Sequence, residues 1–265
     1  MTQPASDSNP RRVSPHDPHH GKEGFLSSIQ SLLGIIVVAI FIITFSIQPF
    51  RIPSGSMEPT LLIGDFLLVD KQITTPGASD LIFPTPRIHR GEVVVFHYPV
   101  NPTMHLVKRV IGLPGDHLKL RDGRVYINGQ ALPEPYAMYR PSAPDNYRDN
   151  FPRLQNADPA VDSRWWIRMH SLIDDGELII PSGEYFVLGD NRNDSEDSRY
   201  WGFVPRAAIV GEPLLIYFSL EQHPGNDQIA FAPSSNAAVL HPHRSGAVDA
   251  LADFARWDRT LQIVK

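Results

Sequence analysis

A long apolar run near the N-terminus constrains this chain more than any other feature. No charged residue occurs from Gly24 to Phe50, and the centre of the run, Leu32 to Phe45, is almost wholly apolar. About 20 residues of helix cross the hydrocarbon core of a bilayer, so the run is long enough to span one. A cleavable signal peptide has a shorter apolar core, and Arg51-Ile52-Pro53 makes a poor cleavage site. A buried core helix is the remaining alternative. The length of the run favours a membrane span, so the sequence predicts a transmembrane helix over residues 24–50.

Basic residues near this run predict its orientation. Arg11, Arg12 and Lys22 precede it, whereas only Arg51 lies among the first fifteen residues after it. Basic residues accumulate on the cytoplasmic side of membrane helices. We therefore expect a single-pass protein with the N-terminus inside and everything after Phe50 outside.

Composition excludes several classes of function. The chain has no cysteine, which excludes disulfides, cysteine-ligated zinc and a thiol nucleophile. The formal net charge of -5 gives no indication of a nucleic-acid partner, which would favour a basic patch. The 25 prolines and 18 glycines favour a loop-rich, mainly β fold over a helical one.

Pattern along the chain divides it into a tail, the membrane helix, a β domain and an extension. Residues 1–23 are rich in Pro, Ser, His and charge, and predict a disordered cytoplasmic tail. Residues 51–220 predict an extracytoplasmic β domain with a loop-rich insertion at about 120–178, of which the interval 132–163 is the most proline-rich. Within 221–265, the spacing of apolar residues predicts a short helix over 248–263. The predicted strands are 66–69, 92–98, 104–111, 124–127, 184–188 and 208–220.

Lys108 is a candidate general base. Leu106, Lys108 and Val110 share one face of a predicted strand, because side chains alternate along a strand. Burial disfavours the charged form of lysine, and a fall of about 2 units from a pKa near 10.4 would make it a base near neutral pH. Arg109 does not deprotonate in proteins, so its role is structural. Taken alone, a lysine in such a strand is more often an exposed surface residue, and the serine motif is what favours Lys108 as a base.

Ser56 is the candidate nucleophile. It lies between Pro53 and Pro59, and Gly55 permits a tight turn that exposes the hydroxyl. Such a turn directs the Ser56 amide, and the hydroxyl of Ser54, toward a developing oxyanion. An ordinary Ser/Gly linker after a membrane helix is the alternative for this segment alone.

A third polar segment, Gly189–Gly202, follows an apolar strand. Its acidic oxygens lack the spacing of an EF-hand, so no metal site is predicted. A supporting loop explains it better, with Asp197 pairing with Arg199 and Ser195 orienting the neutral amine.

Four segments, in this order, closely resemble the motif boxes of bacterial type I signal peptidases, and the resemblance covers roughly residues 30–220. They are Ser54–Leu61, Arg90–Phe96, Lys108–Asp116 and Gly189–Arg199. The resemblance implies Ser56 as nucleophile, Lys108 as general base and Ser54 as oxyanion-hole donor. It also implies a hydrogen bond from Ser195 to the lysine, and the supporting pair Asp197 and Arg199. The residues implied to line pockets for small substrate side chains are Phe50, Ile52, Met57, Leu61 and Val107.

The activity implied by this resemblance is that of a serine endopeptidase in the bacterial cytoplasmic membrane. An enzyme of this kind removes N-terminal signal peptides from exported precursor proteins at the bilayer and uses no cofactor. Three alternatives have weaker support: a non-catalytic membrane-tethered scaffold, a peptidase dedicated to one substrate, and a self-cleaving Ser/Lys regulator. The regulator would carry a DNA-binding domain where this chain has the apolar run.

Overall fold

A computed structural model describes residues 20–71, 87–155, 158–221 and 255–264, and for residues 20–26 and 41–46 it describes only the backbone. The chain divides into two compact units between Thr44 and Phe45. The first unit holds the helix α1 (His20–Ser46). Among the described residues, no helix has both the length and the apolar character that a bilayer span requires. Most of the predicted tail, residues 1–19, lies outside the described part.

Helix α1 differs from the predicted helix at both ends. It begins at His20, within the predicted tail, and it ends at Ser46 instead of Phe50. Ile47–Arg51 form the strand β1, which pairs with β2 (Asp65–Asp70). Pro49 explains the early end, because proline lacks the amide proton of a helix interior and disfavours helical geometry in the residue before it.

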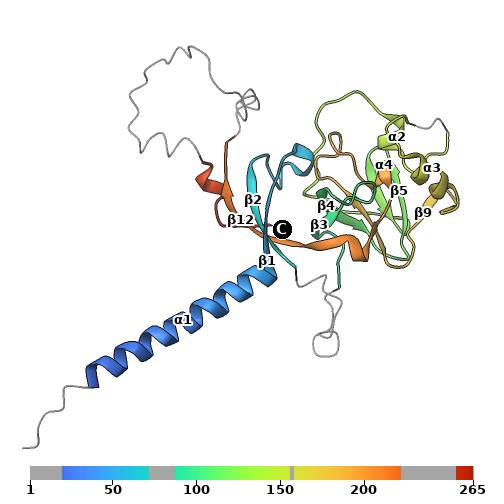
Figure 1. The fold of residues 1–265 in the computed structure, drawn as a ribbon. Helices are drawn as coiled ribbons and strands as arrows, with labels where there is room; N and C mark the ends of the chain where they lie inside the picture. Colours follow the sequence, from blue (N-terminus) through green and yellow to red (C-terminus); the bar gives the residue numbers. More distant parts are fainter. Residues whose placement is uncertain (1–19, 72–86, 156–157, 222–254, 265) are drawn as a thin grey trace, which may run out of the picture. The chain divides into compact units, whose positions relative to one another are not determined.

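The second unit is mainly β, as the sequence predicts, and each of the six predicted strands overlaps a strand of the structure. Its larger sheet is antiparallel and has the order β1-β2-β12-β3-β4-β10-β11, with β13 on β12. Figure 1 shows β12 running from β2 to β3, where register shifts interrupt its pairing with both neighbours. The remaining strands of this sheet are β3 (Val93–His97), β4 (His105–Gly112), β10 (Glu184–Leu188), β11 (Val204–Pro205), β12 (Ile209–Ser219) and β13 (Gln262–Ile263).

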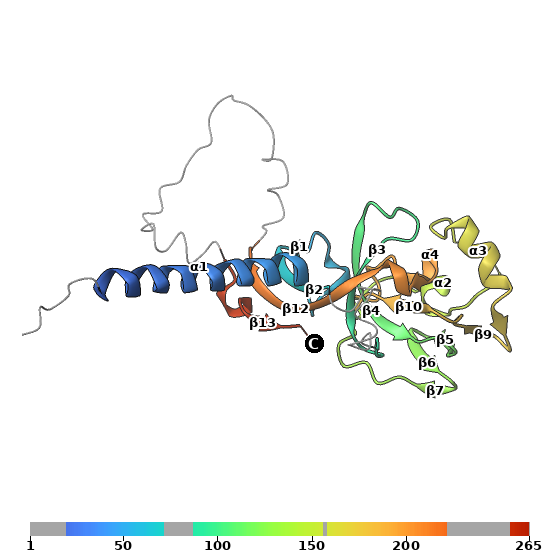
Figure 2. The ribbon, with the colours of Figure 1, turned by 60° about the horizontal axis from the view of Figure 1, so that its bottom comes forward.

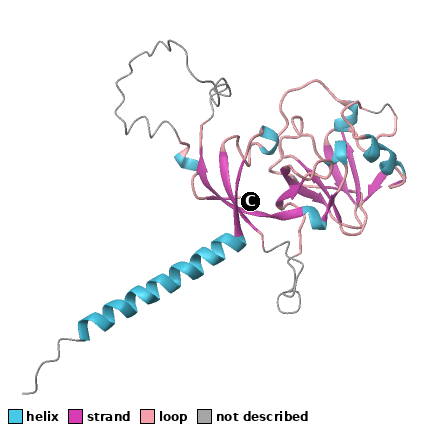
Figure 3. Cartoon of the chain, in the orientation of Figure 1, coloured by secondary structure: helices cyan, strands magenta, loops and turns pink. Residues whose placement is uncertain are grey.

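A smaller antiparallel sheet, with the order β7-β6-β5-β9-β8, lies where the insertion was predicted (Figure 2). Asp122-Gly123 and Asn128-Gly129 have positive φ and join its hairpins, as those residue pairs predict. The strands are β5 (His117–Arg121), β6 (Arg124–Ile127), β7 (Gln130–Ala131), β8 (Ile173–Asp174) and β9 (Glu177–Ile179). Three short helices accompany the sheets: α2 (Asn146–Asp149), α3 (Ser163–His170) and α4 (Ser198–Trp201) (Figure 3).

Separate apolar clusters fill the two regions. The smaller sheet packs with α3, where Trp165 contacts Phe203 edge-on at 5.0 Å between ring centroids. Another cluster lies under β1 and β2 and includes Met57 and Leu61. The turn that carries Ser56 is therefore anchored on a buried apolar base.

The predicted C-terminal helix is wrong over the residues that the structure describes. Residues 248–254 lie outside that part, Trp257–Arg259 form one 3-10 turn, and Gln262–Ile263 pair with β12 as β13. Leu261 is 71% exposed and has a φ of 64°, so it does not belong to a buried helix face. Hydrogen bonds along an open strand edge replace those of a helix here, and apolar spacing alone does not distinguish the two.

Candidate active site

Ser56 and Lys108, 52 residues apart in sequence, meet at the centre of the site. The Lys108 Nζ atom donates to the Ser56 Oγ atom at 2.5 Å. Lys108 is only 4% exposed, and burial lowers its pKa from 10.5 to about 8. Desolvation disfavours the ammonium form, so a large fraction of the amine is neutral slightly above neutral pH.

The Ser56 turn is held from behind by the loop that follows β10. Ser56 lies in the 3-10 turn Gly55–Met57. Asn191 holds this turn twice: its backbone N–H donates to the Ser56 carbonyl and its side-chain Nδ2 to the Gly55 carbonyl, each at 3.1 Å. Gly189 permits this close approach, since a Cβ at that position would overlap the Ser56 carbonyl oxygen. The sequence placed Asn191 and Gly189 in a motif segment but gave neither a role.

Ser54 lies close to the reacting hydroxyl. It has an extended backbone immediately before the turn, and its Oγ atom is 3.5 Å from Ser56 Oγ. Its side chain is exposed. The hydroxyl is thus within reach of the space beside Ser56.

The supporting loop has a buried ion pair at its base. Arg199 donates to Asp197 through Nε and Nη2, both at 2.8 Å, and the two side chains are excluded from solvent. Burial alone would raise the pKa of Asp197, but Arg199, Lys108 and a hydrogen bond from Ser195 together hold this pKa below its ordinary value. Asp197 is therefore an anion near Lys108 whose charge is already balanced by Arg199.

Ser195 occupies a different position in this network from the one predicted. Its hydroxyl donates to Asp197 Oδ2 at 2.8 Å. Within the described residues, no hydrogen bond joins Ser195 to Lys108. Its connection to the amine passes through the Asp197 carboxylate.

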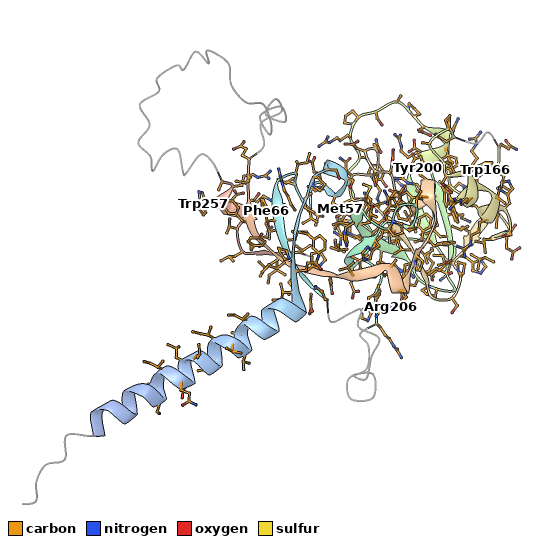
Figure 4. The ribbon with its side chains drawn as sticks, in the orientation of Figure 1. Met57, Phe66, Trp166, Tyr200, Arg206 and Trp257 are labelled. Atoms are coloured by element: carbon orange, nitrogen blue, oxygen red, sulfur yellow. The ribbon has the colours of Figure 1, made fainter. Side chains whose placement is uncertain are left out.

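The five predicted pocket residues belong to one apolar cluster. Ile52, Met57 and Leu61 are buried, and Phe50 and Val107 pack against them half-exposed (Figure 4 labels Met57). The structure thus brings together residues from β1, the Ser56 turn and β4.

A cleft of about 550 Å³ opens beside the Ser56–Lys108 contact. Ser54, Ser56, Lys108 and Ser195 all line it. Its other lining residues are Tyr98, Met104, Leu106, Asp145, Asp158, Ala160, Asn193, Asp194, Glu196, Tyr200 and Trp201. Across the described ranges, no group of three or more His, Asp or Glu side chains is arranged to hold a metal ion. The arrangement offers a hydroxyl, a partly neutral amine and hydrogen-bond donors beside a peptide-sized cleft.

A family model and several known proteins are similar to this sequence. A family model described as "Signal peptidase, peptidase S26" matches residues 25–218. Signal peptidase I of Pseudomonas aeruginosa is 34% identical over 72% of this chain and 71% of its own length. Signal peptidase I of Aquifex aeolicus is 33% identical over 72% of this chain and 83% of its own length. A crystal structure of a signal peptidase I from Enterococcus faecalis is 34% identical, covers 48% of this chain and 97% of that one, and has a TM-score of 0.35.

The family match covers both sequence segments that meet in the site, the Ser56 turn and the strand of Lys108. The relatives match over most of their own length as well, so the similarity is not confined to one motif. The chain belongs to the signal peptidase family of serine endopeptidases, peptidase S26.

Proposed function

We propose that this chain removes signal peptides from exported precursors with Ser56 as the nucleophile and Lys108 as the general base. The observation that carries this assignment is the 2.5 Å contact between Lys108 Nζ and Ser56 Oγ. A lysine serves as a base only when its amine is neutral, and burial lowers the pKa of Lys108 to about 8. The site thus meets both requirements of a Ser/Lys pair, proximity and a weakened hold on the proton.

The reaction proceeds through an acyl-enzyme. Lys108 takes the Ser56 proton as Ser56 Oγ attacks the scissile carbonyl carbon, and the resulting oxyanion accepts hydrogen bonds from the Ser56 amide and the Ser54 hydroxyl. The C–N bond then breaks, and the Lys108 ammonium gives its proton to the leaving amine. The neutral amine next takes a proton from water, whose oxygen attacks the acyl carbon. The bond from that carbon to Ser56 Oγ then breaks, and the Lys108 ammonium returns its proton to Ser56 Oγ, which restores both groups. No cofactor takes part in these steps.

The Asp197–Arg199 pair and Ser195 position the amine without reacting. The buried carboxylate attracts the ammonium form that Lys108 takes after each proton transfer, while Arg199 keeps the pair neutral overall. Ser195 fixes the Asp197 oxygen by donating to it. These residues tune the base through its electrostatic surroundings.

The apolar cluster at the Ser56 turn determines which substrates the enzyme selects. We assign Phe50, Ile52, Met57, Leu61 and Val107 to the recognition of the small side chains that precede a signal-peptide cut. Ile52, Met57 and Leu61 are buried, so the apolar base of the Ser56 turn is close-packed.

Helix α1 is proposed as the membrane anchor, with the N-terminus in the cytoplasm and the β unit outside the bacterial cytoplasmic membrane. The uncharged run from Gly24 to Phe50 and the basic residues before it support this topology. Ser56 follows the end of α1 by ten residues, so the tether is short. Confinement of enzyme and precursor to one membrane raises their effective concentration.

Incubation of the detergent-purified chain with a labelled exported precursor tests these assignments. We expect one cut after a small side chain, identified by N-terminal sequencing, and none with Ser56→Ala or Lys108→Arg. Lys119→Arg is the matched control, because Lys119 is half-exposed and pairs with Glu177 away from the cleft. Near-normal cleavage by Lys108→Arg would exclude the neutral-amine mechanism, since arginine stays protonated.

A further inference from the structure

Carboxylates surround the cleft beside Ser56. Asp145, Asp158, Asp194 and Glu196 all line it, and Lys108 is the sole basic residue among its lining side chains in the described part of the chain. Within the described residues, none of the four carboxylates forms an ion pair. Among the described residues that line it, the cleft therefore carries more acidic than basic side chains.

Two of these carboxylates come from the interval 132–163, for which the sequence suggested no role. This interval is fixed against the loop after β10, since Arg192 and Glu134 form a buried ion pair of 2.6 Å and Asn193 donates to the Arg140 carbonyl at 2.6 Å. The backbones also meet, with Met138 N–H donating to the Asp190 carbonyl at 2.7 Å. Residues 134–140 of the interval are consequently held against this loop.

Glu196, in the loop after β10, acts electrostatically on other residues of the cleft. Burial is the main cause of the raised pKa of Tyr98, and Glu196 raises it further. Glu196 also opposes the lowering of the Lys108 pKa that burial causes. The negative charge of Glu196 therefore acts on Lys108, beside the space where a peptide bond would be cut.

An independent feature of the cleft points to an extended peptide. Trp201 lines it, is 6% exposed, and its Nε1–H finds no hydrogen-bond partner among the described residues. A buried donor without a partner is costly, and a backbone carbonyl of a bound chain is a suitable acceptor. Trp201 thus brings a buried donor without a partner to the wall of the cleft that the four acids also line.

We propose that Asp158 and Glu196, with Asp145 and Asp194, form an anionic subsite that favours basic side chains just after the scissile bond. This inference rests on the proposed function. The small residues before the cut are assigned to the apolar cluster of Phe50, Ile52, Met57, Leu61 and Val107, and none of these five lines the cleft in the described part of the chain. The start of the released chain is the part of the precursor left to face the carboxylates.

Three precursors that differ only in the second and third residues after the cut test the subsite with the detergent-solubilised full chain. These positions carry Lys-Lys, Gln-Gln or Glu-Glu. We expect kcat/KM for the lysine precursor to exceed that for the glutamate precursor by about tenfold at low salt. The ratio falls toward one in about 1 M salt, where charges are screened within roughly 3 Å.

The double variant Asp158→Asn with Glu196→Gln removes two charges and keeps side-chain size. The Ala160 N–H donates to Asp158 Oδ1 at 2.8 Å, and an amide at position 158 still offers an oxygen to accept that bond. The lysine-to-glutamate ratio is expected to fall to about twofold. Asp174→Asn is the control, because Asp174 is exposed on β8 and does not line the cleft, and it leaves the ratio and the activity unchanged.

The outcomes separate the two proposals. Cleavage of the glutamine precursor by the native chain but not by Ser56→Ala, with equal rates for lysine and glutamate, would overturn the subsite and keep the proposed function. A ratio that is large but insensitive to salt or to the double variant would also overturn the subsite. Failure to cut all three precursors would overturn both.

Discussion

Arg109 and Asp190 form a two-contact ion pair beside the candidate site. Arg109 Nε lies 2.8 Å from Asp190 Oδ1 and Nη2 lies 2.7 Å from Oδ2, and the side chains are 2% and 0% exposed. Lys108, the preceding residue on β4, points to the opposite face and forms no ion pair among the described residues. Two adjacent basic residues are thus both buried but in different surroundings. The Arg109 guanidinium pairs with a carboxylate, whereas burial lowers the pKa of the Lys108 amine.

Replacement of Arg109 by lysine tests the value of this geometry. A lysine keeps the charge but not the planar fork, so the second contact to Asp190 and the 2.6 Å bond to the Gly91 carbonyl are lost. We expect Arg109→Lys to lower the free energy of unfolding by about 2 kcal/mol, because a buried carboxylate is left under-satisfied. Urea denaturation measures this change. Arg124→Lys, at an exposed site on β6, is the control and should change the stability by less than about 0.5 kcal/mol.

The activity should rise with pH through the folded pKa of Lys108. Burial lowers that pKa to about 8, and the neutral amine is the reactive form. Below pH 8 the neutral fraction falls about tenfold per pH unit, so kcat/KM should rise steeply from pH 6 and level off above 8. A profile that is flat from pH 6 to 9, or that rises only near pH 10, would contradict the neutral-amine mechanism.

The same burial should cost stability at low pH. The unfolded lysine holds its proton up to about 10.5 and the folded one only to about 8, so stability rises with pH between these values. Below pH 8 the folded state bears the full cost of burying the protonated amine, which is roughly 3 kcal/mol at about 1.4 kcal/mol per pKa unit. Lys108→Met should therefore be more stable than the native chain at pH 6, and the gain should shrink by pH 10.5. Chemical denaturation at both pH values measures it, and an equal gain at both would show that charge burial is not the cause.

Local pattern was sufficient for the strands and their hairpin turns, whereas the candidate pair of Ser56 and Lys108 was assigned from four motif segments taken together. The strand of Lys108 was predictable because aliphatic residues flank the lysine along it. In the structure Lys108 is buried among them. The hairpin turns followed from Asp-Gly and Asn-Gly. In each case the determining interaction lies within a few residues.

Long-range contacts were not predictable in this way. Asn191 supports a turn 136 residues away, and nothing in its neighbourhood identifies the carbonyl that it binds. The C-terminal segment has apolar residues at helical spacing, yet two of its arginines bind groups that are distant in sequence. Arg256 donates to the Ser219 hydroxyl and the Ile63 carbonyl. Arg259 donates to the Thr60 carbonyl and to the Asp65 carboxylate. Those partners favour an extended segment on β12, and they are distant in sequence.

Gly189→Ala should separate catalysis from folding. A Cβ there would overlap both Ser195 Oγ and the Ser56 carbonyl oxygen, whereas the backbone of Gly189 is not in the left-handed region, so contact alone is the obstacle. Rotation can move the Ser195 hydroxyl but not its Cβ, which would lie 2.6 Å away, so the backbones of both Ser195 and Ser56 must shift to make room. A displacement of about 1 Å at a nucleophile costs on the order of 100-fold, so kcat should fall by about that factor while KM changes little. Gly34→Ala, where a Cβ meets no atom within 4 Å, is the control and should retain native activity. A Gly189→Ala protein with native kcat would mean that the Ser56 turn adjusts without losing its alignment with Lys108.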